Sequence, residues 1–370
     1  MATAYYLAKN HGVGSVAVLE RGWIGGGNTG RNTTVIRSNY FFPASAAFYD
    51  LSLRLYESLG RELNFNIMFS QRGMLILACN RHQVETSRRV LNAMQLNGVD
   101  AEWLEPEQVY AKEPLLSRTG RFPILGAVNQ PRAGTARHDA VAWGYARAAD
   151  ALGVEIIQQC EVTGFVRNGS AVCGVRTNRG QILADKVCVS VAGHSSQLAA
   201  MAGLTLPVTS MSLQAFVSEP LKPVLNTVTL SPSTGTYVSQ TDKGEIVVGG
   251  GLDLYPSYAQ RGNFGTVEKI TTGLLEMFPA LSRVRLMRQW AGVVDIVKDS
   301  SPILGESPVR NLYFNCGFGT GGFKAIPAGG FTMAHTLATG QPHELIRPFS
   351  LERFASGRLI DESGASGIAH

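Results

Sequence analysis

The first 20 residues constrain the fold more than any other stretch of the sequence. Residues 2–9 are small or helix-forming, and Gly12 and Gly14 interrupt this run. The segment SVAVLE that follows is typical of a short buried strand, and it finishes on an acidic residue, Glu20. Helix, turn, strand and acid in this order make up the second half of a strand–helix–strand unit.

Strand–helix–strand units of this type bind dinucleotides. A glycine-rich turn, GxGxxG, joins the first strand to the helix, and an acidic residue follows about 20 residues later. Glu20 lies at that distance from Met1, so we expect the glycine turn and the first strand to lie just upstream of Met1. A misassigned start codon or a fragment would explain this arrangement, and an unrelated helix–strand pair is the alternative.

The composition is that of a globular protein with a large core. The 370 residues suffice for two domains or one elaborate domain, and 45% of them are hydrophobic while 16% are charged. The net charge of +5 comes from scattered residues, so no basic run indicates nucleic-acid binding. Because the sequence shows no signal peptide and no apolar run long enough to span a bilayer, we expect no membrane association.

The five cysteines follow neither a metal-binding nor a redox spacing. They form no CxxC and no Cys/His pattern, and their number is odd. We therefore expect free thiols in a reducing cytoplasm, and no metal site.

The remaining sequence mixes helices with strands. Residues 48–97 are typical of helices, with one strand, GMLILAC, between two charged segments. The segment HDAVAWGYARAADALG has apolar positions at helical spacing and predicts an amphipathic helix. Strands are expected to dominate from 206 to 294, with one helix near 267–278.

Two loops are unusually rich in glycine. RGWIGGGNTGRNTTVIRSNY includes the residues after Glu20, and CGFGTGGFKAIPAGG leads into the last long helix. Backbone N–H groups and small polar side chains in such loops can hold a pyrophosphate or a flavin ring. A surface loop is the alternative, but three consecutive glycines beside the second strand favour a ligand-binding role.

Four stretches carry a resemblance to a known family: VLERGWIGGGNTGRNTTVIRSNY, GTARHDAVAWGYARAADALGVEII, SVAGHSSQLAAMAGL and NCGFGTGGFKAIPAGG. Through them the chain resembles, over nearly its whole length, the FAD-dependent amine oxidoreductases of the D-amino-acid-oxidase and glycine-oxidase type. Within that family it is most similar to the beta subunits of heterotetrameric sarcosine oxidases. The sequence departs from the family because it lacks the GxGxxG turn before its first helix.

The resemblance and the order of elements predict an α/β fold in which a Rossmann-like FAD-binding domain carries an inserted, mixed-sheet substrate domain of α+β type. The FAD-binding domain is expected to be discontinuous, without its first strand and phosphate loop, over residues 1–45, 132–205 and 290–345. The substrate domain, which is also the FMN side, is expected over 46–131 and 206–289. Residues 346–370 are expected to form a C-terminal tail.

The resemblance implies a catalytic subunit that holds FAD noncovalently and FMN covalently, through a histidine at the interface with a larger alpha subunit. It further implies gamma and delta subunits, and NAD and folate sites on the alpha subunit. The expected reaction is the oxidative demethylation of sarcosine to glycine. Electrons would pass from FAD to FMN and then to oxygen, giving hydrogen peroxide.

Several residues are expected at the cofactors. Glu20, at the end of its strand, would accept hydrogen bonds from the adenosine ribose, and a solvated strand-end acid is the alternative. The resemblance places further residues around the pyrophosphate and the flavin ring: Arg21, Asn28, Thr29, Gly30, Arg31, Asn32, Thr33, Val162, Gly193, Gly319, Gly322 and Lys324.

Arg37 and Lys324 are the expected substrate residues. The carboxylate of sarcosine requires a fixed cationic clamp, and an arginine offers a bidentate fork. Arg37 lies in TTVIRSNY, where a strand should pass beneath the flavin, and Lys324 lies in GTGGFKAIP, at the start of the last long helix. A lysine at a helix N-terminus is electrostatically unfavourable, which argues against a chance placement. A surface lysine is the alternative.

His138 is the expected attachment site of FMN. It opens the predicted amphipathic helix, and a helix N-terminus disfavours the imidazolium and so favours the neutral, nucleophilic imidazole. A histidine without a role is the alternative, and the resemblance of GTARHDAV to a flavin-attachment segment favours attachment. In a related single-subunit group the flavin is attached to a cysteine shortly before the final glycine loop. That stretch has no cysteine here, so Cys316 is expected to be a small core residue.

Two other functions stay open. The chain could be a single-flavin oxidase or dehydrogenase of another N-methyl or D-amino acid. It could also be a noncatalytic remnant that serves in assembly, which the missing phosphate loop would favour.

Overall fold

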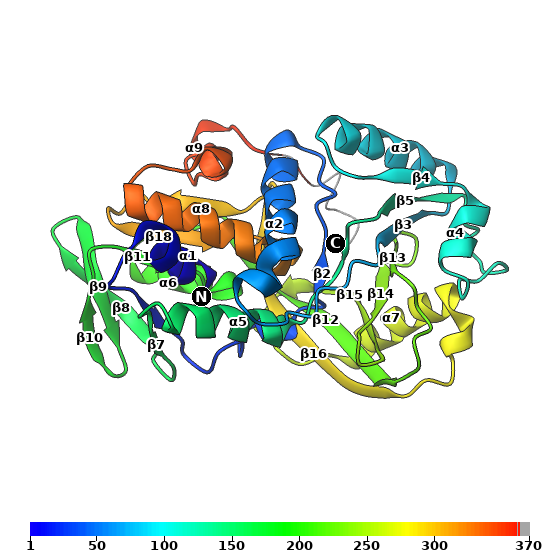
Figure 1. The fold of residues 1–370 in the computed structure, drawn as a ribbon, viewed down its shortest axis with the longest axis horizontal. Coiled ribbons are helices and arrows are strands. Elements are labelled where there is room, and N and C mark those ends of the chain that lie inside the picture. The colour runs from blue at the N-terminus through cyan, green and yellow to red at the C-terminus, as the bar shows by residue number, and fades with distance from the viewer. Residues whose placement is uncertain (361, 363–370) are drawn as a thin grey trace.

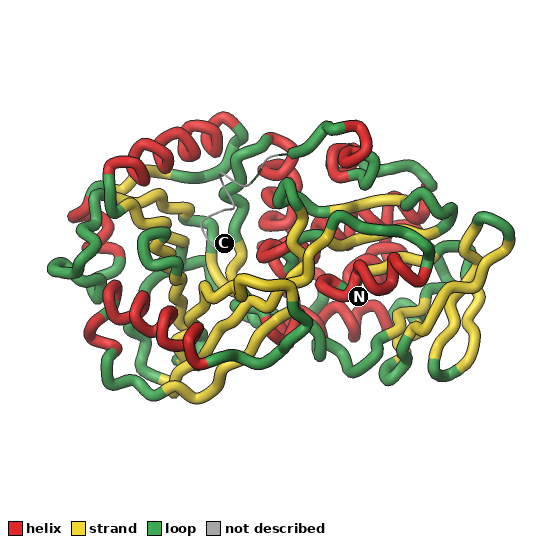
Figure 2. Tube along the Cα trace, turned by 180° about the vertical axis from the view of Figure 1, so that it is seen from behind, coloured by secondary structure: helices red, strands yellow, loops and turns green. Residues whose placement is uncertain are grey.

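The computed structural model describes residues 1–360 and 362, and these residues form two lobes side by side (Figure 1). The first lobe contains the N-terminus, as the view from behind also shows (Figure 2). The second lobe is built on a large sheet, and a long helix, α2 (Pro43–Glu62), stands between the lobes.

The first lobe combines parallel strands with helices. β1 (Ala17–Leu19) pairs in parallel with β7 (Glu155–Ile157), and β11 (Val187–Val189) pairs in parallel with β18 (Leu312–Cys316). β17 (Ile303–Glu306) adds an antiparallel edge to β18. These two groups of strands share no ladder among the described residues. A separate antiparallel sheet consists of β8 (Val162–Asn168), β9 (Ala171–Thr177) and β10 (Gly180–Leu183).

Four helices pack around these strands: α1 (Ala2–His11), α5 (His138–Asp150), α6 (Ser195–Met201) and α8 (Ile326–Thr339). Aromatic side chains fix α1 against α5 and α8, because Tyr6 meets Tyr145 of α5 and Phe331 of α8 edge to face. A Cβ on Gly330 of α8 would lie 2.5 Å from the Cβ of Ala2, so this glycine allows the close helix contact. α1 ends on Gly12, which adopts a left-handed φ of 63°.

The second lobe is a mixed sheet of eight strands in the order β16-β12-β15-β14-β13-β3-β5-β4. Only the β13–β3 pair is parallel among its described ladders. The strand bounds are β3 Met74–Ala78, β4 Glu102–Leu104, β5 Gly126–Gln130, β12 Val208–Pro220, β13 Val228–Ser231, β14 Thr236–Gln240, β15 Glu245–Pro256 and β16 Leu286–Val297.

Three helices belong to this lobe: α3 (Arg81–Leu96), α4 (Pro106–Lys112) and α7 (Phe264–Met277). α7 packs on β14 and β15, where Cβ atoms on Gly251 and Gly273 would clash with side chains of the facing element. α3 packs on β3 and β5. The long strands β12 and β16 also reach η2 (Ala192–His194) of the first lobe, so the sheet extends into the junction of the lobes.

Several short elements complete the fold near the junction of the two lobes. β2 (Val35–Ile36) pairs antiparallel with β6 (Gly134–Thr135). After α8 the chain forms η6 (Glu344–Phe349) and α9 (Arg353–Ser356), and Arg353 makes a buried ion pair with Asp299 at 2.7 Å. Ile346 and Phe349 of η6 are buried in one core cluster with Phe48 of α2 and Tyr313 of β18, so this segment is packed on the rest of the molecule.

The predicted α/β fold with a large mixed sheet is confirmed. The predicted amphipathic helix is α5, and the helix predicted near 267–278 is α7, which begins at Phe264. The division into an FAD-binding and a substrate domain stays a prediction. Within the part of the chain that the structure describes, no helix is long and apolar enough to cross a membrane.

Candidate active site

The two predicted substrate residues meet at one tyrosine. Arg37 follows directly after β2, and Lys324 lies in η5 (Phe323–Ala325), just before α8. The Lys324 ammonium is 3.4 Å from the hydroxyl of Tyr40, and the Arg37 guanidinium lies over the Tyr40 ring, 5.0 Å from its centroid. Segments almost 290 residues apart thus place both cations on the same side chain.

Tyr40 is itself fixed by a second tyrosine. Its ring is stacked on Tyr49 of α2, with centroids 3.8 Å apart and planes at 6°. Lys324 Nζ is 5.9 Å from the centroid of each ring. A Cβ on Gly321 would come within 2.4 Å of the Tyr49 hydroxyl, so only glycine lets the loop lie this close to the tyrosines. Sequence reasoning missed this pair, although Tyr40 is the last residue of the segment TTVIRSNY that contains Arg37, and Tyr49 follows nine residues later.

The site brings two cationic side chains together, and the carboxyl of Glu362 lies near enough to Arg37 to interact with its charge. Lys324 is only 5% exposed, and neither it nor Arg37 belongs to an ion pair among residues 1–360 and 362. Burial lowers the pKa of Lys324 well below its ordinary value, and the charge of Arg37 lowers it further. A buried ammonium beside a second cation is costly unless an anion joins it, so the arrangement suits an anionic ligand.

Arg37 is also held by its own segment. It donates to Oδ1 of Asn39 at 2.6 Å, and Asn39 is 1% exposed. Glu362 lies nearby and accepts hydrogen bonds from the backbone N–H groups of Phe41 and Phe42, where α2 begins. Burial raises the pKa of Glu362, while the charge of Arg37 opposes that rise.

A buried carboxylate shapes the final glycine loop. Asp295 of β16 accepts hydrogen bonds from the backbone N–H groups of Gly317 and of Gly319, the latter at 3.2 Å. Burial raises the pKa of Asp295 to about 6, and these backbone donors oppose the rise. Gly319 has φ +53°. Gly322 lies at the end of the same turn, where an added Cβ would be 3.5 Å from the Cβ of Phe318. Asp295 was missed because nothing in the sequence links it to residues 22 positions later.

Glu20 lies where a nucleotide ribose is expected. Its carboxylate accepts a hydrogen bond from the N–H of Gly22 at 2.7 Å, at the carboxyl end of β1. Burial lowers the pKa of the Met1 amino group, which precedes α1. The charges of Cys188 and Glu20 nearby act in the opposite direction. A helix N-terminus beside the carboxyl ends of parallel strands is the geometry of a dinucleotide crevice, so these residues fit FAD.

The loop after β1 uses its polar side chains to brace itself. Asn28 exchanges two hydrogen bonds with the backbone of Val293 in β16, and Thr33 donates to the hydroxyl of Tyr237 at 2.9 Å. Asn32 accepts from the N–H of Thr34 and donates to the carbonyl of Thr29. These contacts fix the backbone of the loop rather than direct its side chains outward.

The remaining predicted cofactor residues are spread more widely. Arg31 donates to the carbonyls of Gly26 and Gly27, and a Cβ on Gly30 would meet the carbonyl of Gly25 at 2.4 Å. Arg21 is exposed and lies 3.9 Å from Glu161. Val162 is the first residue of β8, and Gly193 in η2 packs so closely on Val293 that a Cβ would lie 2.4 Å from that residue.

His138 is the first residue of α5, at the other end of the β2–β6 ladder from Arg37. Its Nδ1 is buried and has no hydrogen-bond partner among the described residues. Burial lowers its pKa, Asp139 raises it, and the charges of Arg137 and Arg288 lower it. An imidazole whose protonation is disfavoured by burial, and whose buried Nδ1 has no hydrogen-bond partner among the described residues, is compatible with covalent attachment of a group.

No cluster of three histidine, cysteine or acidic side chains able to hold a metal ion occurs within the described ranges. All five cysteines, Cys316 included, are free thiols, and Cys316 is fully buried. Burial raises the pKa of the Cys316 thiol, as expected for a core residue.

Comparison with known proteins identifies the family of the chain. Residues 1–336 match the family described as FAD dependent oxidoreductase. The chain is 53% identical over 372 residues to sarcosine oxidase subunit beta of an Arthrobacter species, covering 100% of this chain and 92% of that protein. It is 52% identical over 371 residues to sarcosine oxidase subunit beta of Rhodobacter capsulatus, covering 100% and 89%.

Solved structures show the same fold. L-proline dehydrogenase from P. horikoshii superposes with a TM-score of 0.91 at 28% identity, covering 97% of this chain and 95% of that one. Glycine oxidase from Geobacillus kaustophilus superposes with a TM-score of 0.84 at 22% identity, covering 95% of each chain.

Proposed function

Because this chain belongs to the family of FAD-dependent oxidoreductases, we propose that it is the catalytic beta subunit of a sarcosine oxidase. The proposed reaction is the oxidative demethylation of sarcosine to glycine. Two relatives named sarcosine oxidase subunit beta, more than half identical to this chain over its full length, support this choice over another N-methyl or D-amino acid substrate and over a noncatalytic role.

The observation that carries the proposal is the meeting of two cations, Arg37 and Lys324, at Tyr40. Sarcosine presents one carboxylate, and Arg37 with the buried Lys324 supplies the two positive donors that such a group requires. The stacked Tyr40 and Tyr49 rings form an apolar wall beside these cations. A clamped carboxylate would hold the N-methyl group in one orientation and in a place with little water.

FAD is the cofactor of the proposed reaction, and it supplies the acceptor for the hydride of the N-methyl carbon. Glu20 would hold the ribose hydroxyls, since its carboxylate ends β1 beside the start of α1. The loop 317–322, whose fold Asp295 fixes through the N–H groups of Gly317 and Gly319, would lie against the flavin ring. The braced loop after β1 would cover the pyrophosphate.

The proposal includes FMN attached to His138, and alpha, gamma and delta partner subunits, with NAD and folate on the alpha subunit. The buried, unpartnered Nδ1 of His138 and its lowered pKa support the attachment site. The word subunit in the names of the relatives supports the existence of partners. A cytoplasmic location is part of the proposal, and the five free thiols are compatible with it.

Removing each cation tests the clamp. Methoxyacetate is a suitable probe, because it replaces the amine of sarcosine by an ether oxygen and cannot be oxidised in the same way. We expect Arg37→Ala and Lys324→Ala each to weaken methoxyacetate binding and to raise the KM for sarcosine. The loss in binding free energy should be roughly 1.5–3 kcal/mol per lost charge-assisted hydrogen bond. The dissociation constant is measured from the change in flavin absorbance on titration.

Arg54→Ala is the matched control. Arg54 is an exposed arginine of α2 that pairs with Asp50, so its loss should leave methoxyacetate binding unchanged. Unchanged binding in both clamp variants would refute the assignment of the carboxylate site.

A further inference from the structure

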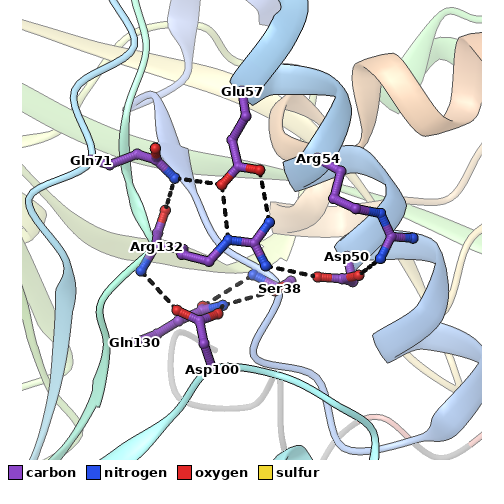
Figure 3. A network of polar contacts seen from close by, with 8 residues as sticks. All are labelled: Ser38, Asp50, Arg54, Glu57, Gln71, Asp100, Gln130 and Arg132. Atoms are coloured by element: carbon purple, nitrogen blue, oxygen red, sulfur yellow. Dashed lines mark hydrogen bonds and ion pairs between the residues drawn. The ribbon is translucent and has the colours of Figure 1, made fainter.

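Ser38, the residue after Arg37, forms a closed hydrogen-bonded pair with Gln130 (Figure 3). The N–H of Ser38 donates to Oε1 of Gln130 at 3.1 Å, and Nε2 of Gln130 donates to Oγ of Ser38 at 2.7 Å. The two residues are 0% and 1% exposed. Two buried hydrogen bonds between one amide and one residue fix both the backbone and the side chain of Ser38.

Ser38 lies between the two residues that form the arginine side of the clamp. Arg37 precedes it, and Asn39, whose Oδ1 receives the Arg37 guanidinium at 2.6 Å, follows it. Rotation of the Ser38 backbone would therefore move the guanidinium and its acceptor in different directions. The two hydrogen bonds with the Gln130 amide oppose this rotation, together with the hydrogen bond that the N–H of Tyr40 donates to the carbonyl of Ser38 at 2.8 Å.

The same strand end also holds the helix on the other side of the site. Gln130 donates to Asp100 at 3.3 Å, and Asp100 accepts the N–H of Arg132 at 2.9 Å. The Arg132 guanidinium donates two hydrogen bonds of 2.8 Å to the carboxylate of Glu57 in α2 (Figure 3). α2 carries Tyr49, the ring on which Tyr40 is stacked. Residues 130–132 thus connect the Arg37 segment with the tyrosine wall.

We propose that Gln130 is a positioning residue for substrate carboxylate binding, acting through Ser38 on the placement of Arg37. Gln130 reaches neither cation of the clamp in any of its hydrogen bonds. It sets affinity for carboxylates and leaves the oxidation step to the residues at the flavin. This inference rests on the carboxylate clamp of the proposed function.

The test compares two Gln→Met variants of the FAD-loaded protein, purified with any partner subunits that accompany it. Gln130→Met keeps the length of the side chain and removes both hydrogen bonds with Ser38 and the one to Asp100, whereas Ser38→Ala leaves the Asp100 bond in place. Gln71→Met is the matched control. Among the described residues, the Gln71 side chain donates hydrogen bonds only to Glu57 and to the carbonyl of Arg132, which belong to the same network. We expect Gln130→Met to raise the dissociation constant of methoxyacetate and the KM for sarcosine about tenfold, with kcat changed less than about threefold.

Gln71→Met should leave both constants within about twofold of the unmodified protein. Ser38→Ala is the milder second variant, for the case that Gln130→Met does not fold. It removes one of the two hydrogen bonds and should weaken methoxyacetate binding by about threefold. Arg37→Ala is measured in parallel to separate this inference from the proposed function.

Unchanged methoxyacetate binding in Ser38→Ala and in any folded Gln130→Met would overturn the inference, and so would an equal loss in Gln71→Met. A fall in kcat and FAD content without a change in binding would show a merely structural role and overturn it as well. If Arg37→Ala weakens binding while the Gln130 and Ser38 variants do not, only this inference fails. If Arg37→Ala also has no effect, the clamp itself fails with it.

Discussion

Lys324 is a buried amine whose charge depends on what lies beside it. Its lowered pKa in the ligand-free protein arises from burial and then from Arg37. A carboxylate in the clamp would favour the ammonium and raise this pKa again, so binding should take up a proton. We expect the affinity for methoxyacetate to fall as the pH rises above the lowered pKa of Lys324.

Titration of methoxyacetate at a series of pH values checks this, together with calorimetry in buffers of different ionisation enthalpy. In Lys324→Met the pH dependence should flatten, because the titrating group is gone. Proton release on binding, or an identical pH dependence in Lys324→Met, would contradict the role given to this lysine.

His138 makes the second prediction at this scale. If FMN is bonded to it, acid precipitation of the protein should leave yellow flavin in the pellet, while FAD stays in the supernatant. His138→Ala should lose the precipitated flavin and keep the extractable FAD. The exposed His82 of α3 provides a control, since His82→Ala should change neither. Yellow precipitate that persists in His138→Ala would place the attachment elsewhere.

At the residue scale, chemistry is easier to predict from sequence than packing partners. Arg37 and Lys324 could be named because their segments and charge types suit a carboxylate, and the structure brings them together. Tyr40 and Asp295 could not be named from the sequence. Tyr40 stacks on Tyr49, and Asp295 accepts a hydrogen bond from a residue 22 positions later, and both contacts exist only in the folded chain.

The final glycine loop is the element that we propose to lie against the flavin. The carboxylate of Asp295 can only accept, and both its oxygens are used by loop N–H groups. In Asp295→Asn the amide nitrogen would face one of these donors, so one hydrogen bond would be lost. We expect faster hydrogen exchange in the peptide over 315–323 and weaker retention of FAD.

Exchange measured by mass spectrometry on the unmodified protein and the variant checks this prediction. Peptides of α4, which lies at the outer edge of the second lobe and packs in a separate core cluster, serve as the internal reference (Figure 1). Equal exchange over 315–323 in the two proteins would show that Asp295 does not fix the loop.

Among the elements, those with a clear period were predictable. α5 begins at the predicted His138, and α7 matches the helix predicted near 267–278 to within a few residues. The order of the strands could not be predicted from the sequence. β3 pairs in parallel with β13, more than 150 residues later, through contacts that no local pattern encodes. The same holds for the Asn28 contacts with β16, which fasten the loop after β1 to the second lobe's sheet.

For the molecule as a whole, Glu113 makes stability depend on pH. This carboxyl is 0% exposed, and only Oε2 receives hydrogen bonds, from the N–H groups of Asn226 and Thr227. Burial raises its pKa from 4.5 to about 7. Its contribution to stability is therefore fully present below pH 4.5 and is lost as the pH rises through about 7, in total roughly 3 kcal/mol.

Glu113→Gln removes this titration and keeps an acceptor for the two N–H groups. We expect the unfolding midpoint of the variant, relative to the unmodified protein, to rise between pH 5 and pH 8, an interval that brackets the folded pKa of about 7. Glu107→Gln is the control, because Glu107 is an exposed acid of the same helix α4 that pairs with Arg118. A constant difference between Glu113→Gln and the unmodified protein across this range would contradict the prediction.

Direct reduction of the flavin tests the central claim that this chain oxidises sarcosine at the Tyr40 clamp. FAD-loaded protein is mixed with sarcosine in the absence of oxygen, and the absorbance of the oxidised flavin is followed with time. We predict rapid bleaching that saturates with sarcosine concentration and that methoxyacetate inhibits competitively. Flavin that stays oxidised with sarcosine, yet is still bleached by a chemical reductant, would contradict the account.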